Sequence, residues 1–265
     1  MPIIYQPTGM AREYSPYACN LYIGCSHGCR YCYAPHTIQR SASDYFKVPS
    51  PRRNVLRLME QELLNQTYHK QILISFIGDV YCKTADNGFV TRAALCLLDK
   101  YKAPVAVLSK GGNRILRDID VFRDFGSRIM VGTTLTFIDE AKSREWEPGA
   151  SLPNERLAVL STLHKAGIKT LASFEPSIEP HESLKLIERT LEDDSVIHYK
   201  IGKVNNFRGY GDDFDWSEYL TQALKMLREA KKQVYVKKSI RKYAPEVELL
   251  PEETDPEKWI VRSDT

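Results

Sequence analysis

The chain has 265 residues, of which 43% are hydrophobic and 27% are charged, and its formal net charge is +3. This composition is typical of a folded globular protein and excludes a disordered or linker protein. The length fits one domain, and the small net charge excludes a strong overall attraction to nucleic acid.

The start of the chain has no basic segment followed by an apolar one, and no later apolar run approaches the length of a membrane-spanning helix. We therefore expect a cytoplasmic protein with no membrane association. The six cysteines should be reduced thiols in such a compartment. Cysteines that cluster then indicate a metal or redox centre rather than disulfides.

Short β-branched apolar runs alternate with amphipathic helical stretches about six times, which is the pattern of consecutive βα units. The predicted strands are, in chain order, 17–23, 72–78, 105–109, 128–135, 169–174 and 196–201, with a short strand at 234–236. The predicted helices are 53–65, 89–102, 115–125, 155–166, 182–191 and 216–232. Gly167 is expected to follow the end of the fourth helix.

Strands separated by helices are parallel and joined by right-handed crossovers. The fold class is therefore α/β, with either an open doubly wound sheet or a partial or complete barrel. In both architectures ligands bind at the carboxyl ends of the strands. We divide the chain into an N-terminal extension (1–16), a core (17–238) and an irregular C-terminal tail (239–265) rich in proline and acidic residues.

Three of the six cysteines, Cys25, Cys29 and Cys32, are close together in the segment 24–33. Spacings of four and three residues cannot place three thiols on one face of a strand, so the segment is predicted to be a loop wrapped around a ligand. Its two glycines permit such wrapping. A fully ligated four-iron cluster needs four thiolates, so three cysteines would leave one iron open.

A zinc site is one alternative, with His27 or His36 as the fourth ligand. Zinc ligands usually come as two separated pairs, and the sequence has no second pair. Three unrelated structural cysteines are the other alternative.

The motif C-x3-C-x-aromatic-C, with Tyr31 as the aromatic residue, is the signature of the radical S-adenosylmethionine (AdoMet) superfamily. Further segments resemble, in the same order, motifs of the spore photoproduct lyase-like family, also described as DNA repair photolyase-related. They are 9–16, 20–25, 32–35, 76–81, 108–110, 117–118, 131–134, 147–148 and 166–168. The resemblance spans about residues 5 to 205 and implies that the core is a partial (β/α)6 barrel of the TIM type.

The resemblance implies an enzyme with two cofactors, a 4Fe-4S cluster and AdoMet. Reductive cleavage of AdoMet would give a 5′-deoxyadenosyl radical that abstracts a hydrogen atom from the substrate. The implied substrate is a nucleic acid, and the implied partner is a reductant such as flavodoxin or ferredoxin. Radical modification of a peptide or small metabolite is the alternative, followed by a non-catalytic zinc or iron–sulfur binding module.

The resemblance also implies roles for individual residues, and an ordinary structural role stays open for each residue outside the cysteine motif. The implied cluster ligands are Cys25, Cys29 and Cys32. The implied AdoMet contacts are Tyr31 near the adenine, Gly78 and Asp79 at the amine, Ser109 with Lys110 at the carboxylate, Thr133 and Thr134 at the ribose or methionine, and Glu175 at the ribose or the substrate.

The enzyme that gives the family its name has an additional cysteine after the second strand, which returns a hydrogen atom to the substrate radical. In this chain Cys82 follows that strand about two residues later. It is a candidate hydrogen-atom donor, with an incidental thiol as the alternative. Tyr81 is the other redox-capable candidate.

Basic residues cluster near the C-terminus, at Lys231, Lys232, Lys237, Lys238, Arg241 and Lys242. They are either the solvated end of a helix and its neighbouring strand or a contact for a phosphate-bearing partner.

Overall fold

The computed structural model describes residues 2–205, 207, 210, 211 and 213–263. Eight strands form one sheet in the order β1-β2-β5-β6-β7-β8-β9-β10. Their bounds are β1 (Ile4–Tyr5), β2 (Tyr17–Cys19), β5 (Ile72–Ile74), β6 (Val105–Ser109), β7 (Ile129–Thr134), β8 (Lys169–Ser177), β9 (His198–Lys203) and β10 (Gln233–Val236). All pairs are parallel except β1 with β2. The predicted α/β class with a parallel sheet is confirmed.

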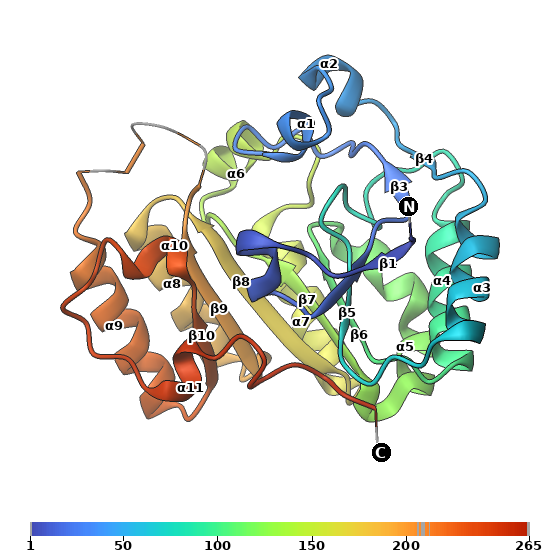
Figure 1. Ribbon diagram of the computed structural model, residues 1–265. Coiled ribbons are helices and arrows are strands. Elements are labelled where there is room, and N and C mark those ends of the chain that lie inside the picture. The colour runs from blue at the N-terminus through green and yellow to red at the C-terminus, as the bar shows by residue number, and fades with distance from the viewer. Residues whose placement is uncertain (1, 206, 208–209, 212, 264–265) are drawn as a thin grey trace.

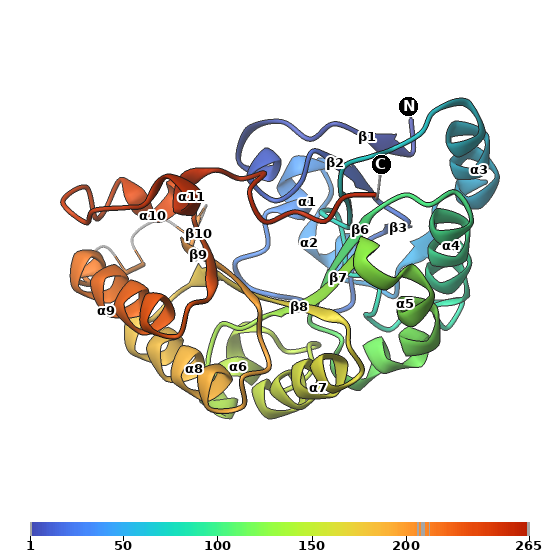
Figure 2. The same cartoon turned by 90° about the horizontal axis from the view of Figure 1, so that it is seen from below.

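The sheet curves into an arc that is open between β10 and β1, and helices cover its outer face (Figures 1 and 2). These helices are α3 (Val55–Asn65), α4 (Phe89–Lys100), α5 (Ile119–Phe125), α7 (Pro153–Lys165), α8 (Pro180–Glu192) and α9 (Trp216–Glu229). The architecture is the expected partial barrel. Among the described residues, no helix is long and apolar enough to cross a membrane.

The helix ends follow local chemistry. Pro153 and Pro180 occupy first helical positions, where the missing N–H is tolerated. The Asp215 side chain accepts the Glu218 N–H at 2.9 Å and caps α9. Gly167 follows α7 with a φ of +79°, as expected for a residue beyond a helix C-terminus.

Three of the predicted elements differ from the structure. The predicted strand 72–78 ends at Ile74, and the residues after it form a bend. The predicted helix 115–125 is a 3₁₀ helix, η2 (Gly112–Asp118), followed by the shorter α5. The predicted strand 17–23 is broken into β2 and β3 (Tyr22–Ile23), which pairs with β4 (Ser50–Pro51) in a separate small sheet. At the break, Asn20 Oδ1 accepts the backbone N–H groups of Phe76 and Ile77, so this side chain ties the bend to the end of β5.

The remaining elements are short. They are η1 (Gly9–Glu13), α1 (Ala34–Thr37), α2 (Ala42–Tyr45), η3 (Gly126–Arg128), α6 (Glu140–Trp146), α10 (Lys238–Arg241) and α11 (Pro251–Thr254). Of these, α1, α2 and α6 lie beyond the carboxyl ends of the strands, at the top of Figure 1.

The C-terminal residues return across the opposite end of the sheet. Val261 is buried against Met130 and Leu171, and Arg262 forms an isolated antiparallel bridge with Lys70. Trp259 donates its indole N–H to the Val234 carbonyl at 3.2 Å. Because these contacts cover the amino-terminal ends of the strands, the carboxyl ends are left as the accessible end of the barrel.

Candidate cofactor site

A cavity of about 490 Å³ lies at the carboxyl ends of the strands. Most of the residues that the sequence singles out contribute to its wall. These are Cys25, Cys29, Tyr31, Cys32, Gly78, Asp79, Ser109, Lys110, Thr134 and Glu175. A volume of this size is typical of sites for cofactors and other small molecules. The topology therefore brings together residues from five separate stretches of the chain.

The cysteine loop is held by backbone contacts to neighbouring segments. Cys25 donates its N–H to the Tyr45 carbonyl at 3.0 Å, and Arg30 donates its N–H to the Trp146 carbonyl at 2.9 Å. Gly78 has a φ of +89°, and a Cβ at this position would come within 2.5 Å of the Gly24 carbonyl oxygen. Gly78 is thus required for close approach of the loop to the end of β5.

The three cysteine sulfurs do not all lie within 4.8 Å of one another, because the one described group of ligand side chains with that spacing consists of Glu179, His181 and Glu182. Sulfurs bound to a single tetrahedral zinc ion, with Zn–S bonds of about 2.3 Å, would be about 3.8 Å apart. Thiolates of a four-iron cluster each bind a different iron, and three cysteines that are not all in close contact are compatible with that arrangement.

Two buried polar atoms in the cavity wall have no hydrogen-bond partner in the described part of the chain. They are Nε2 of His27 and the hydroxyl oxygen of Tyr45. Burial raises the pKa of Cys29 to about 12, so this thiol is neutral at pH 7 unless a cation stabilises the thiolate. Unpartnered polar atoms and buried neutral thiols in one wall fit a site that holds a metal cluster and a polar ligand.

Asp79 is at the centre of a hydrogen-bond network. Its Oδ1 accepts the Ser109 hydroxyl at 2.7 Å and the Tyr81 N–H at 2.8 Å, and its Oδ2 accepts the Lys110 N–H at 2.7 Å. Nδ1 of His27 lies 3.4 Å from Oδ2. Burial acts to raise the Asp79 pKa, but His27 and these hydrogen bonds outweigh burial and lower it. Asp79 therefore joins the ends of β5 and β6 to the cysteine loop.

Burial lowers the pKa of His27 to about 4, although the Asp79 carboxylate acts in the opposite direction. The imidazole is consequently neutral at pH 7. With Nδ1 beside a carboxylate, the tautomer that carries its proton on Nδ1 leaves Nε2 as an acceptor in the cavity wall.

Lys110 brings a positive charge to the cavity. Its Nζ lies 5.6 Å from the ring centroid of Tyr31, in a cation–π arrangement. Burial acts to lower the Lys110 pKa, but electrostatic attraction to the ionised form of Cys29 and to the Glu147 carboxylate outweighs burial and raises it. The ammonium group is therefore charged at pH 7, and a carboxylate is the kind of group that it would bind.

The other predicted residues lie at the edge of the cavity or behind its wall. Thr134 lines the cavity, whereas the Thr133 hydroxyl donates to the Ser109 carbonyl at 2.6 Å. The Tyr81 hydroxyl donates to Asp118 Oδ2 at 2.9 Å, and Cys82 is buried beside Cys25. Neither Tyr81 nor Cys82 is among the described residues of the cavity wall. A hydrogen-atom-donor role for either of them stays a prediction.

The wall opposite the cysteines contains a charged pair. Lys237 Nζ lies 2.6 Å from Glu175 Oε2 and 3.9 Å from the ring centroid of Tyr14. The Tyr14 hydroxyl donates to the same Glu175 oxygen at 2.5 Å, and the Asn205 amide donates to Oε1 at 3.1 Å. Glu175 thus lines the cavity as predicted, but four elements of the fold meet at its carboxylate.

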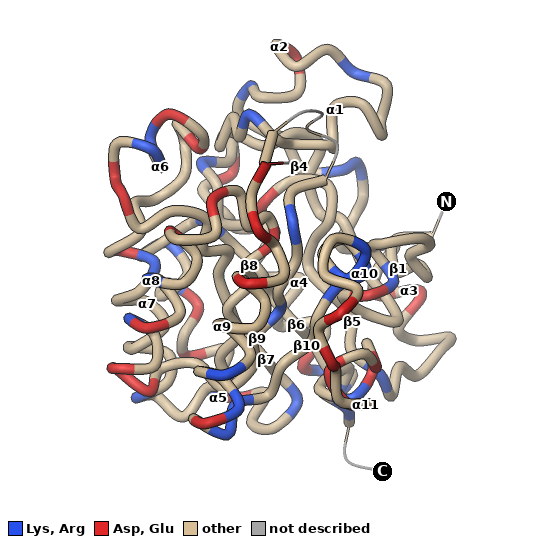
Figure 3. Tube along the Cα trace, turned by 90° about the vertical axis from the view of Figure 1, so that its left-hand side faces the viewer, with Lys and Arg blue, Asp and Glu red and all other residues tan. Residues whose placement is uncertain are grey.

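Sequence reasoning missed Tyr14 and Lys237. Lys237 belongs to the basic cluster near the C-terminus, yet its side chain is only 2% exposed. Lys232 pairs with Asp194, and Nε of Arg241 donates to the Val236 carbonyl at 2.7 Å. The members of the cluster therefore differ in their surroundings, and Figure 3 shows acidic and basic positions interspersed along the chain trace. The only signal for Lys237 was its position directly after β10.

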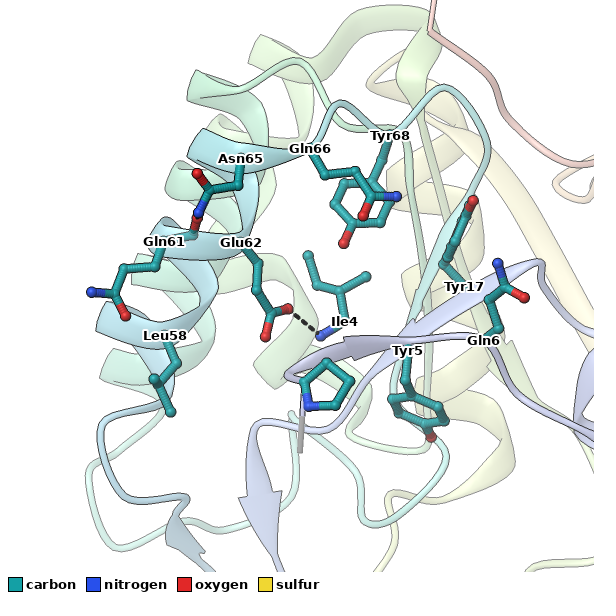
Figure 4. Close-up of a pocket in the computed structure, with 11 residues that line it drawn as sticks. Ile4, Tyr5, Gln6, Tyr17, Leu58, Gln61, Glu62, Asn65, Gln66 and Tyr68 are labelled. Atoms are coloured by element: carbon teal, nitrogen blue, oxygen red, sulfur yellow. Dashed lines mark hydrogen bonds between the residues drawn. The ribbon is translucent and has the colours of Figure 1, made fainter.

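A second groove, of about 610 Å³, lies between β1 and α3 (Figure 4) and shares no described lining residue with the first cavity. Glu62 extends from α3 across this groove and accepts the backbone N–H groups of Ile3 and Ile4 at 2.7 and 2.8 Å. Glu62 therefore anchors the N-terminal strand to α3.

No family model matches the chain. It is 32% identical over 165 residues to an uncharacterized protein of Methanocaldococcus jannaschii, a match that covers 61% of this chain and 60% of that protein. It is 24% identical over 159 residues to an uncharacterized protein of Mycobacterium tuberculosis, covering 57% of this chain and 46% of that protein. The chain spans less than two thirds of the length of either relative.

Solved structures identify the architecture. A spore photoproduct lyase variant with bound AdoMet and dinucleoside spore photoproduct superimposes with a TM-score of 0.65 at 13% identity, over 87% of this chain and 78% of that one. The fold is that of the radical AdoMet enzymes. Streptococcus suis SuiB bound to S-adenosylmethionine gives a TM-score of 0.59 at 14% identity, over 88% of this chain and 53% of that one. Native anSMEcpe with bound AdoMet gives a TM-score of 0.56 at 14% identity, over 83% of this chain and 62% of that one.

Proposed function

We propose that this chain is a radical AdoMet enzyme whose 4Fe-4S cluster is held by Cys25, Cys29 and Cys32. The observation that supports it most is the convergence of these cysteines with Asp79, Lys110 and unpartnered polar atoms in one cavity of an AdoMet-enzyme fold. When bound, the cluster would supply the electron that splits AdoMet into methionine and a 5′-deoxyadenosyl radical able to abstract a substrate hydrogen atom. The six cysteines are all free, which fits the cytoplasm.

The residues of the chain then bind and orient the cofactors. Lys110 provides the cation for the AdoMet carboxylate, and the Tyr31 ring covers the adenine side. Asp79 accepts hydrogen bonds from the Ser109 hydroxyl and the Lys110 N–H and so holds these two residues of the cavity wall in place. Gly78, Thr133 and Thr134 complete the strand ends, and Glu175 faces the substrate or the AdoMet ribose.

For the substrate we propose a nucleic acid, attacked at a C–H bond. The resemblance to spore photoproduct lyase-like sequences supports this proposal, as does the structural neighbour that contains a dinucleoside. A peptide is the second candidate, because SuiB bound to a precursor peptide has the same fold. Of the C-terminal basic cluster, Lys231, Lys238 and Lys242 are exposed and could contact phosphate groups. Flavodoxin or ferredoxin is the proposed electron donor.

Anaerobic reconstitution with iron and sulfide tests the cofactor proposal. The wild-type protein should bind about four irons, show charge-transfer absorbance, and release 5′-deoxyadenosine from AdoMet and reductant. Cys29→Ser should lose these properties, whereas Cys96→Ser, at an exposed position on α4, should keep them. A wild-type protein that gains no absorbance and releases no 5′-deoxyadenosine would refute the proposal.

Deuterated substrates distinguish the substrate classes. Deuterium from an oligonucleotide should appear in 5′-deoxyadenosine, and binding of that oligonucleotide should weaken with salt. Transfer only from labelled peptides would replace the nucleic-acid proposal with the peptide one.

A further inference from the structure

The connection between α6 and α7, residues 147–152, lies directly against the cysteine loop. Gly149 donates its N–H to the His27 carbonyl at 2.7 Å, and Ser151 donates its N–H to the Lys110 carbonyl at 3.0 Å. A Cβ on Gly149 would come within 2.1 Å of the Ser26 carbonyl oxygen. The two segments are therefore in backbone contact, with no room for a side chain between them.

One carboxylate of this connection, that of Glu147, faces inward and is 1% exposed. Its Oε1 accepts the hydroxyl of Tyr31 and, at 3.1 Å, the hydroxyl of Thr136. Its Oε2 accepts Nη2 of Arg156 at 2.6 Å. Each oxygen has a partner, and Glu147 is not among the described residues that line the cavity.

Arg156 is also 1% exposed and all three of its nitrogens donate hydrogen bonds. Besides Glu147 it binds the carbonyls of Ser151 at 2.7 Å and Thr134 at 3.0 Å. Burial acts to raise the Glu147 pKa, but Arg156 and Lys110 outweigh burial and lower it. A charged pair that is buried this deeply and fully hydrogen-bonded fixes geometry more than it contributes net stability.

Tyr31, the aromatic residue of the cysteine motif, lines the cavity and donates its hydroxyl to Glu147. Thr134 also lines the cavity, but it contacts Arg156 through its backbone carbonyl. We propose that Glu147 is a positioning residue that acts through the Tyr31 hydroxyl, fixing this ring and the cysteine loop in the geometry that binds AdoMet. The inference has two parts. That Glu147 holds the cysteine loop follows from hydrogen bonds of the chain alone, whereas that it favours AdoMet binding rests on the proposed function.

The loop part is tested on the metal-free protein by hydrogen exchange of peptides covering 28–33. Glu147→Gln and Tyr31→Phe should each speed exchange there on the order of tenfold, because the loop loses a charge-assisted hydrogen bond. Glu145→Gln is the matched control: Glu145 is exposed, two residues away, and pairs with Arg30 of the same loop. Unchanged exchange in both Glu147→Gln and Tyr31→Phe would overturn the inference, whether or not the protein binds AdoMet.

The AdoMet part is tested on the reconstituted protein by calorimetry, with the electron paramagnetic resonance signal of the reduced cluster as a second readout. Glu147→Gln and Tyr31→Phe should each raise the AdoMet Kd on the order of tenfold with iron content retained. The double variant should be no weaker than the weaker single one, since both changes remove the same contact. Glu147 would have only a structural role if the variants had a lowered melting temperature but an unchanged AdoMet Kd. The same would hold if the double variant lost the product of the affinities that the two single variants lose.

The two proposals fail in different ways. If the wild-type protein binds no AdoMet, the proposed function fails, and the exchange experiment still decides whether Glu147 holds the loop. If Glu147→Gln does not fold, Tyr31→Phe, which removes a single hydroxyl, tests the same contact.

Discussion

Replacement of Asp79 by Asn is expected to destabilise the protein by about 2–4 kcal/mol. The amide oxygen can keep the bonds from Tyr81 and Ser109, but its NH₂ group would face the Lys110 N–H, which is bonded to Oδ2 at 2.7 Å in the wild type. The variant loses one charge-assisted hydrogen bond, worth about 1.5–3 kcal/mol, and leaves a buried donor unpaired, which costs about 1–3 kcal/mol. Relaxation of the Lys110 backbone should recover part of the sum.

The assay is urea unfolding of the metal-free protein under reducing conditions, with the midpoint and the m-value both fitted. Asp124→Asn, at an exposed position on α5, is the matched control and should change the free energy of unfolding by less than about 0.5 kcal/mol. A loss below about 0.5 kcal/mol for Asp79→Asn would show that Asp79 does not hold the strand ends together, and the reasoning about the network would be refuted.

Three further predictions concern other parts of the fold. Burial and the charge of Lys237 lower the Lys200 pKa to about 7, whereas an unfolded lysine titrates near about 10.4. Between pH 7 and 10 the unfolded chain therefore binds more protons than the folded one. The free energy of unfolding of the wild type should rise in this range by up to about 1.4 kcal/mol per pH unit more than that of Lys200→Met. An equal pH dependence of stability in the two proteins would contradict the lowered Lys200 pKa. Gly149→Ala should abolish iron binding on reconstitution, since its Cβ would collide with the loop backbone; full iron content would show that the loop tolerates displacement. Val261→Ala should cost about 2 kcal/mol in urea unfolding because the side chain is 3% exposed; a neutral result would mean that the tail is not part of the folded core.

The parallel strands could be predicted because each is a short apolar run between turn residues, and β6 was predicted with the bounds that the structure has. Breaks within such runs are harder to see. The bend after Cys19 depends on Asn20 accepting two N–H groups from residues more than 50 positions away, and no local pattern encodes that contact. The same is true of β1, whose partner strand gives its two residues their conformation.

The cavity wall could be predicted wherever a polar residue directly follows a strand, as Lys110 follows β6. The residues that complete the wall on the side opposite the cysteines could not be predicted from the sequence. Tyr14 precedes the first parallel strand, and Lys237 looked like part of a solvated basic cluster until β10 placed it beside Glu175. The segment 147–148 was picked out by its resemblance to a family motif, but that resemblance gave Glu147 no role. Its pairing with Arg156 and Tyr31 needed the tertiary fold, because an arginine on a helix is usually a surface residue.

The contact between Tyr31 and Glu147 joins residues 116 positions apart in the chain. During synthesis at 5–20 residues per second, the cysteine loop would leave the ribosome about 6–23 s before the segment that clamps it. For that interval the three thiols belong to an unclamped loop that solvent, oxidants and competing metal ions can reach. Under the proposed function, the distance along the chain between the loop and Glu147 would then set how long the cluster ligands stay exposed before the loop is fixed.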